Sequence, residues 1–149
     1  MANESSEIEL IVEKYVEHIK HQMRSRSYRV ANELRNNAQL VLRGARHGRR
    51  YKKPNTKAHY TASAPGEPPA VRTGTFRASW IPSYNYGEGL EGYSVKASIN
   101  SYVKTENGKY VLGDILEEGT SKIAPRPYKE KIEEKTRKAA LKIYDEPYF

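Results

Sequence analysis

The chain contains no cysteine, and this absence excludes several kinds of site at once. Without thiols there is no disulfide framework, no thiolate metal site and no cysteine nucleophile. Long apolar runs are also missing, because no stretch approaches the roughly 18 apolar residues that a membrane-spanning helix needs. The N-terminal "MANESSEIELIVEKY" lacks the basic start and apolar centre of a secretory signal. We therefore expect a protein that is made and kept in a reducing cytoplasm, with no membrane contact.

Patterns typical of catalysis are missing as well. The sequence has no glycine loop that could cradle a phosphate and no nucleophile elbow. Glu117 and Glu118 are adjacent, so on a helix they diverge and cannot act as a facing acid–base pair. His18 and His21 share a helix face, but no well-spaced carboxylate completes a metal site. The sequence therefore predicts a protein that is not an enzyme and binds no metal or cofactor.

Positive charge and tyrosine are what the sequence has in quantity. The net charge is +8, and ten basic side chains lie between Arg24 and Lys53, where Glu33 is the only acid. Charge this local attracts phosphates or an acidic protein surface. The twelve tyrosines suit surfaces that are wet in the free protein and buried after assembly. With 149 residues, of which 37% are hydrophobic, we expect a single domain, residues 1–149, with a modest core.

Residues 4–45 are predicted to form one long amphipathic helix. Apolar residues recur at steps of three, four or seven from Ile8 to Val41, which places them on one helical face. Such a helix would be about 60 Å long, which exceeds the width of a compact domain of this size. It must therefore either break near Ser25, where the apolar stripe skips a turn, or project beyond its own core onto neighbouring molecules.

Residues 46–72 are predicted to be a basic loop followed by a stiff proline-rich arm. Residues 62–74 read "ASAPGEPPAVRTG". Closely spaced prolines favour a semi-rigid, extended segment with unpaired carbonyls and little entropy to lose on docking. A connection this long is normally functional or disordered.

Residues 73–121 are predicted to hold antiparallel strands and a short helix. A turn at Thr73 brings Phe76 and Trp80 to the core. The runs "SWIPSYNY" and "YSVKASIN" alternate like the strands of a hairpin around "GEGLEG", and Asn107-Gly108 predicts a second hairpin.

Two helical signals complete the chain. "LGDILEEGT" predicts a helical turn that ends at Gly119. Residues 122–149 are predicted to be a C-terminal helix, beginning just after Pro127, with a short tail. This order of elements predicts an α+β fold: a long N-terminal helix, an extended arm, a small antiparallel sheet, a short helix and a final helix.

Two segments, "ASAPGEPPAVRTGTFRAS" and "LEEGTSKIAPRPY", together resemble the signature segments of the neck or tail-completion family of tailed bacteriophages with lambda-type necks, which includes minor tail components and tail-terminator-like proteins. The resemblance covers residues 24–145 in order: a long helix, an "APG-PP---TG-L--S" segment, strands, an "E-GT" turn, then "RP", an aromatic residue and a final helix. Phe76 stands where the family usually has leucine, and the first twenty or so residues look like an extension.

The resemblance implies a structural virion protein, assembled in the host bacterial cytoplasm, that forms a homo-oligomeric ring between the DNA-filled head and the tail. It suggests sixfold symmetry, with twelvefold symmetry as the alternative. The implied partners are head-side connector or adaptor proteins and tail tube or terminator proteins. Whether the chain belongs to the head side or terminates the tail stays open.

Three groups of residues would act in such a ring. The arm would lie across the next subunit through Ala64, Pro65, Gly66, Glu67, Pro68 and Pro69, with Thr73 and Gly74 setting its exit angle. A second interface group would fix the register, with Arg126 pairing with Glu117 or Glu118: Glu117, Glu118, Gly119, Thr120, Arg126 and Pro127. A third, basic group would face DNA or a partner: Arg43, Arg46, Arg49, Arg50, Lys52 and Lys53.

Two interpretations of the basic group stay open. It could line a lumen and touch passing DNA without reading its sequence, or it could grip acidic surfaces of a head-side ring. Tight DNA binding would impede passage through a conduit, which favours protein contact slightly. The alternative for the whole chain is a small basic nucleic-acid-binding protein.

Overall fold

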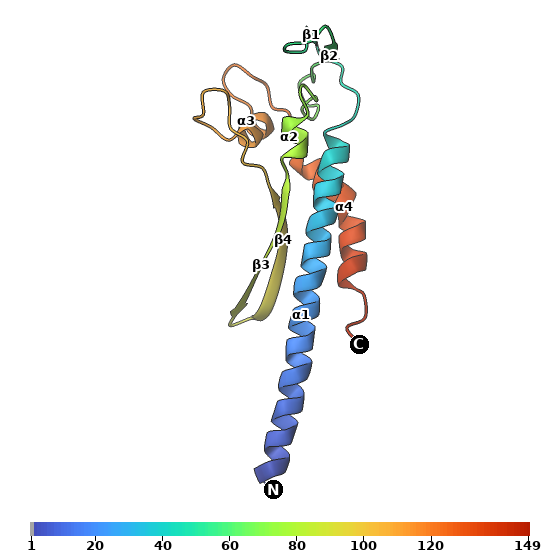
Figure 1. Ribbon diagram of the computed structural model, residues 1–149, viewed down its shortest axis with the longest axis vertical. Helices are drawn as coiled ribbons and strands as arrows, with labels where there is room; N and C mark the ends of the chain where they lie inside the picture. Colours follow the sequence, from blue (N-terminus) through green and yellow to red (C-terminus); the bar gives the residue numbers. More distant parts are fainter. Residues whose placement is uncertain (1) are drawn as a thin grey trace.

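A computed structural model describes residues 2–149, with side chains described from Glu4 onwards, and its fold is α+β as predicted. The elements are α1 (Ala2–Val41), β1 (Arg50–Lys52), β2 (His59–Thr61), α2 (Thr75–Ala78), β3 (Ile81–Gly89), β4 (Gly92–Asn100), α3 (Leu112–Glu118) and α4 (Lys129–Tyr144). Helix α1 forms the long axis, with the β3–β4 ribbon along one side and α4 along the other (Figure 1).

Helix α1 runs without interruption through Ser25. Of the two predicted outcomes, the helix therefore extends beyond its own core and does not break. The apolar stripe skips a turn there because the helix buries polar side chains instead. Arg26 is 3% exposed and donates to the carbonyls of Tyr144, Glu146 and Pro147 in the tail that follows α4. The polar gap in the apolar stripe is therefore the place where the C-terminal tail binds α1.

The hydrophobic core lies near the C-terminal end of α1. Its buried members are Ala38, Leu42, Trp80, Tyr128 and Ile132. Phe76, Trp80 and Tyr128 meet edge to face, with ring centroids 5.6–5.8 Å apart, a favoured geometry for aromatic pairs. The predicted delivery of Phe76 and Trp80 to the core by the turn at Thr73 is thus confirmed.

Strands β3 and β4 form the first predicted hairpin, in register from Ile81 opposite Asn100 to Gly89 opposite Gly92. The second predicted hairpin forms only in part. Gly108 takes a positive φ of 70° at the expected turn, but the pairing around it is a single bridge between Lys104 and Val111. The segment therefore turns back as predicted without building strands.

A further hairpin, β1–β2, lies inside the stretch predicted to be a loop. Tyr51 pairs with Tyr60 in its centre. At its base the Gly48 N–H donates to the Ala62 carbonyl at 2.8 Å, and a Cβ on Gly48 would meet that oxygen at 2.5 Å. Residues 46–72 are thus wrongly predicted to lack strands, because three-residue strands are too short to show an alternating pattern.

Candidate functional site

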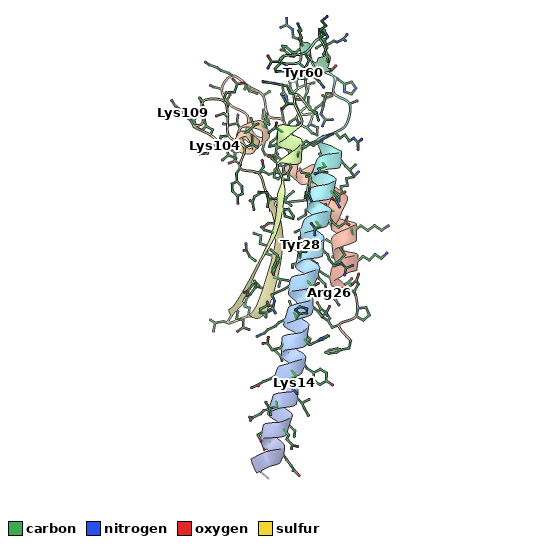
Figure 2. The ribbon with its side chains drawn as sticks, viewed as in Figure 1. Lys14, Arg26, Tyr28, Tyr60, Lys104 and Lys109 are labelled. Atoms are coloured by element: carbon green, nitrogen blue, oxygen red, sulfur yellow. The ribbon has the colours of Figure 1, made fainter. Side chains whose placement is uncertain are left out.

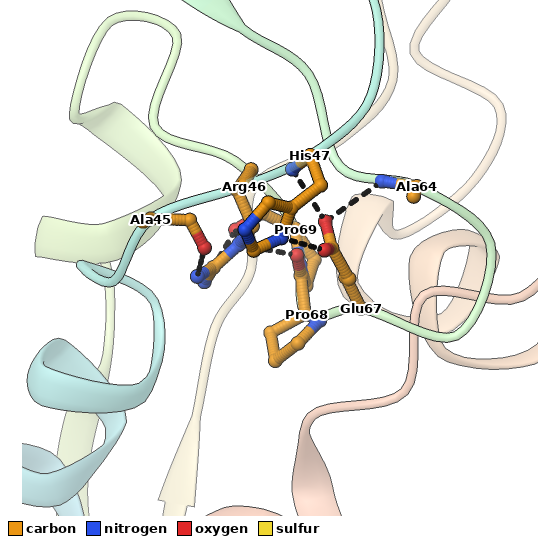
Figure 3. A network of polar contacts seen from close by, with 7 residues as sticks. All are labelled: Ala45, Arg46, His47, Ala64, Glu67, Pro68 and Pro69. Carbon is orange, nitrogen blue, oxygen red and sulfur yellow. Dashed lines mark hydrogen bonds and ion pairs between the residues drawn. The ribbon is translucent and has the colours of Figure 1, made fainter.

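Arg46 fastens the proline segment, residues 62–72, to the end of α1. Its Nε donates to the Pro68 carbonyl at 2.7 Å (Figure 3). Its Nη2 donates to the Val41 carbonyl at 2.7 Å and to the Pro69 carbonyl at 3.2 Å. Partial burial lowers the pKa of Arg46, and an arginine side chain stays protonated in proteins. Arg46 therefore serves its own chain and does not join the outward-facing basic group predicted for it.

Glu67 is the second anchor of the proline segment. Its carboxylate accepts the backbone N–H groups of Ala64 and His47, at 2.9 and 3.0 Å, and the His47 ring nitrogen Nδ1 at 2.5 Å (Figure 3). These hydrogen bonds favour the ionised form and hold the pKa of Glu67 at about 2. The carboxylate thus closes the turn and ties it to the loop that leaves α1.

The segment does not project as the predicted arm. Pro68 and Pro69 are buried, and the Gly66 N–H donates to the Pro125 carbonyl at 3.2 Å. The segment is not extended throughout, because it turns at residues 64–67, where the Glu67 N–H donates to the Ala64 carbonyl at 3.0 Å and Gly66 has a φ of 86°. Arginine and glutamate side chains hold it against its own chain. The prediction of a projecting arm is therefore wrong, whereas contact of these residues with a neighbouring subunit stays a prediction.

The second signature segment forms a tight turn between α3 and α4. Gly119 ends α3 with a φ of 76°, and a Cβ there would meet the Ile123 carbonyl oxygen at 2.7 Å. Thr120 Oγ1 accepts the N–H groups of Lys122 and Ile123, at 3.2 and 3.1 Å. The chain then returns to α3, where the Arg126 N–H donates to the Leu116 carbonyl. The "E-GT" pattern is therefore a turn that requires glycine and a hydroxyl.

Glu117 caps α4 and does not pair with Arg126. Its Oε2 accepts the N–H groups of Tyr128 and Lys129, at 2.9 and 3.2 Å, where a negative charge suits the helix N-terminus. The Arg126 side chain donates to the carbonyls of Ala124 and Pro125. The predicted register pair is thus absent among the described contacts of this chain, while Glu118 stays exposed.

Tyr128, which follows Pro127, joins α3 to the core. Its hydroxyl donates to the Gly113 carbonyl at 2.9 Å, and its side chain is 1% exposed. Burial, with the nearby carboxylates of Glu117 and Asp114, raises the pKa of Tyr128 well above its usual value. A Cβ on Gly113 would meet that hydroxyl oxygen at 2.7 Å. The aromatic residue after "RP" is therefore a packing residue.

The two signature segments face each other across an open groove of about 430 Å³. Its lining is mainly apolar, and four cationic side chains and one carboxylate also line it. The apolar lining includes Leu42, Pro69, Val71, Phe76, Val103, Leu112, Leu116 and Ile123. The charged lining is Arg72, Arg77, Lys104, Arg126 and Glu106. We call this feature the signature groove. The sequence analysis missed it, since it depends on long-range packing.

The β1–β2 hairpin carries most of the predicted basic group to one end of the molecule (Figures 1 and 2). Arg49, Arg50 and Lys52 are exposed on it. The Arg49 guanidinium lies over the Tyr51 ring, 5.7 Å from its centroid, a favourable cation–π arrangement. Arg43 is exposed at the end of α1 and Lys53 is half-buried. This end can attract an anionic surface.

The opposite end of the molecule is the N-terminal part of α1, which extends past the β3–β4 ribbon and α4 (Figure 1). Every side chain from Glu4 to His18 is exposed. The aromatic ring of Phe149 lies against Tyr15 and His18 and covers part of this stretch. Several large apolar side chains in this stretch are exposed: Ile8, Leu10, Ile11, Val12, Tyr15 and Val16. We call residues 4–18 the projecting helix.

Residues 2–149 contain no group of three or more His, Asp or Glu side chains placed to hold a metal ion. His18, which shares a predicted helix face with His21, donates from Nε2 to the Tyr148 carbonyl at 2.8 Å. Over the same residues, no helix is both long and apolar enough to cross a membrane.

No protein-family model, curated protein or solved structure matches the chain.

Proposed function

We propose that this chain is a structural protein of the neck of a tailed bacteriophage, where identical copies form a ring that joins the DNA-filled head to the tail. The observation that carries the proposal is the projecting helix. Ile8 and Val12 are 62% and 54% exposed there. Large apolar side chains left uncovered by their own chain mark an interaction site. A surface of this kind suits a protein that works in an assembly.

The two signature segments support the same proposal. They fold into one unit around the signature groove, held by Arg46, Glu67 and Glu117. Each subunit of a ring must present one surface and receive a different one. The projecting helix and the signature groove are two such surfaces at separate places on the molecule.

The basic hairpin supports contact with an anionic partner. In the proposed neck it would face acidic surfaces of a head-side connector or adaptor, or DNA in the lumen. A second candidate function, nucleic-acid binding by the isolated monomer, is favoured by the exposed Arg49, Arg50 and Lys52 beside Tyr51. Neutralising Arg49 and Arg50 would abolish duplex DNA affinity under this alternative. The neck proposal expects weak binding by the monomer.

Electron microscopy of particles produced without this protein tests the neck proposal. If the protein joins heads to tails, these preparations should contain DNA-filled heads without tails beside free tails. Overlong tails would assign the chain to tail termination within the same neck proposal. Normal infectious virions would overturn it.

A further inference from the structure

The charged lining of the signature groove is mainly cationic. Arg72, Arg77, Lys104 and Arg126 line the groove, and Glu106 is the only carboxylate among the lining residues. Arg72 lies 3.6 Å from Glu106, with both side chains at least half exposed, so that pair is weak. The groove thus combines a mainly apolar lining with surplus positive charge.

The projecting helix has the opposite character. Its apolar stripe includes Ile8, Val12 and Tyr15, at helical spacings of three and four. Glu9 and Glu13 flank the stripe at the same spacings. Between residues 4 and 17 the acids are Glu4, Glu7, Glu9, Glu13 and Glu17, and the only base is Lys14. The helix thus combines an apolar stripe with surplus negative charge beside it.

We infer that the projecting helix of one copy docks in the signature groove of the next. The apolar stripe would contact the apolar side chains of the groove, while the glutamates would meet its cationic side chains. Helix-in-groove recognition uses this combination of anchors and flanking charge. The inference identifies the contact within the proposed ring and rests on self-assembly of the chain.

The helix cannot fill the groove of its own chain. Helix α1 is continuous from Ala2 to Val41, and its N-terminus lies at the far end of the molecule from α3 (Figure 1). Helix and groove are different surfaces, so the contact is head-to-tail and closes into a ring if the rotation between copies permits. Because the two surfaces lie at opposite ends, the long axis of each subunit would run around the circumference.

The chain has no native cysteine, so pairs of introduced thiols report this contact directly. Val12→Cys places a thiol on the projecting helix, and Val103→Cys places one at the groove. Mixed in equal amounts under mild oxidation, the two full-length variants should form a disulfide heterodimer. Lys138→Cys, on the exposed face of α4, is the matched control partner and should give at least tenfold less product.

The control outcomes separate the possible contacts. Strong homodimers of Val12→Cys alone, with no preference for Val103→Cys, would show that projecting helices pair with each other and overturn the groove contact. That result would leave the neck proposal standing, because it concerns the place of contact and not the joining of heads to tails.

Charge reversal gives an independent test by size-exclusion chromatography with light scattering. A Glu9→Lys, Glu13→Lys variant and an Arg72→Glu, Arg126→Glu variant should each self-associate at least tenfold more weakly than the parent chain. Mixing them, or combining all four changes in one chain, should restore association. Circular dichroism checks that each variant is folded, and folded variants that associate like the parent would overturn the inference.

Discussion

His47 binds the carboxylate of Glu67 twice, through its backbone N–H at 3.0 Å and through its ring nitrogen Nδ1 at 2.5 Å. The Ala64 N–H completes the site from within the proline segment. These three donors on one carboxylate tie the proline segment to the loop that follows α1.

The acid titration of Glu67 tests this site. Hydrogen bonds from Ala64 and His47 hold its folded pKa at about 2, below its value in the unfolded chain. The stabilisation is therefore complete at neutral pH and is lost as the pH falls from about 4 towards 2. NMR titration should find the low pKa, and His47→Ala should raise it. His59→Ala, on exposed β2, should leave it unchanged. An ordinary pKa for Glu67 in the parent chain would contradict the geometry.

Gly119→Ala should destabilise the protein more than Gly108→Ala. Both glycines have positive φ, at 76° and 70°. Gly119 also has a ψ of −177°, and this combination is one that essentially only glycine adopts. A Cβ at position 119 also meets the Ile123 oxygen at 2.7 Å, whereas nothing lies within 4 Å at position 108. We expect a loss of about 1 kcal/mol at Gly108 and about 3 kcal/mol or more at Gly119. Equal losses in urea unfolding would show that the tight turn is not as described.

Glu117→Gln should weaken the N-terminus of α4. The change removes the negative charge that accepts the Tyr128 and Lys129 N–H groups. We expect a loss of about 1 kcal/mol in the free energy of unfolding. Glu118→Gln removes the same charge from an exposed neighbour and should change stability by less than about 0.5 kcal/mol. A larger loss of stability in Glu118→Gln than in Glu117→Gln would contradict the cap and favour a role for Glu118 in the turn.

Arg26→Ala should release the C-terminal tail. Arg26 is 3% exposed, donates to three tail carbonyls and lies over the Tyr148 ring, 3.8 Å from its centroid. Losing these hydrogen bonds should cost about 3 kcal/mol. Hydrogen exchange of residues 145–149 should become faster in the variant. Arg35→Ala, on an exposed part of α1, is the control. Unchanged hydrogen exchange of residues 145–149 in Arg26→Ala would contradict the role of Arg26 in holding the tail.

The sequence predicted the elements whose signals are local. Alternation around a short glycine turn predicted β3 and β4, and Pro127 marked the start of α4. The prolines correctly predicted a segment without helix or strand over residues 62–74. Its position depends on Arg46 and Glu67, whose partners lie about twenty residues away. Glu117 had several possible partners, and only packing shows that the α4 N-terminus is the one it binds. Competition between distant partners is what a single sequence leaves undetermined.

Native mass spectrometry of the purified full-length chain tests most directly whether it works as a ring. The account predicts one closed species of six or twelve copies that dissociates at high ionic strength, since the proposed contact pairs glutamates with the cationic side chains of the groove. A monomer that persists at every concentration and at low salt would contradict it.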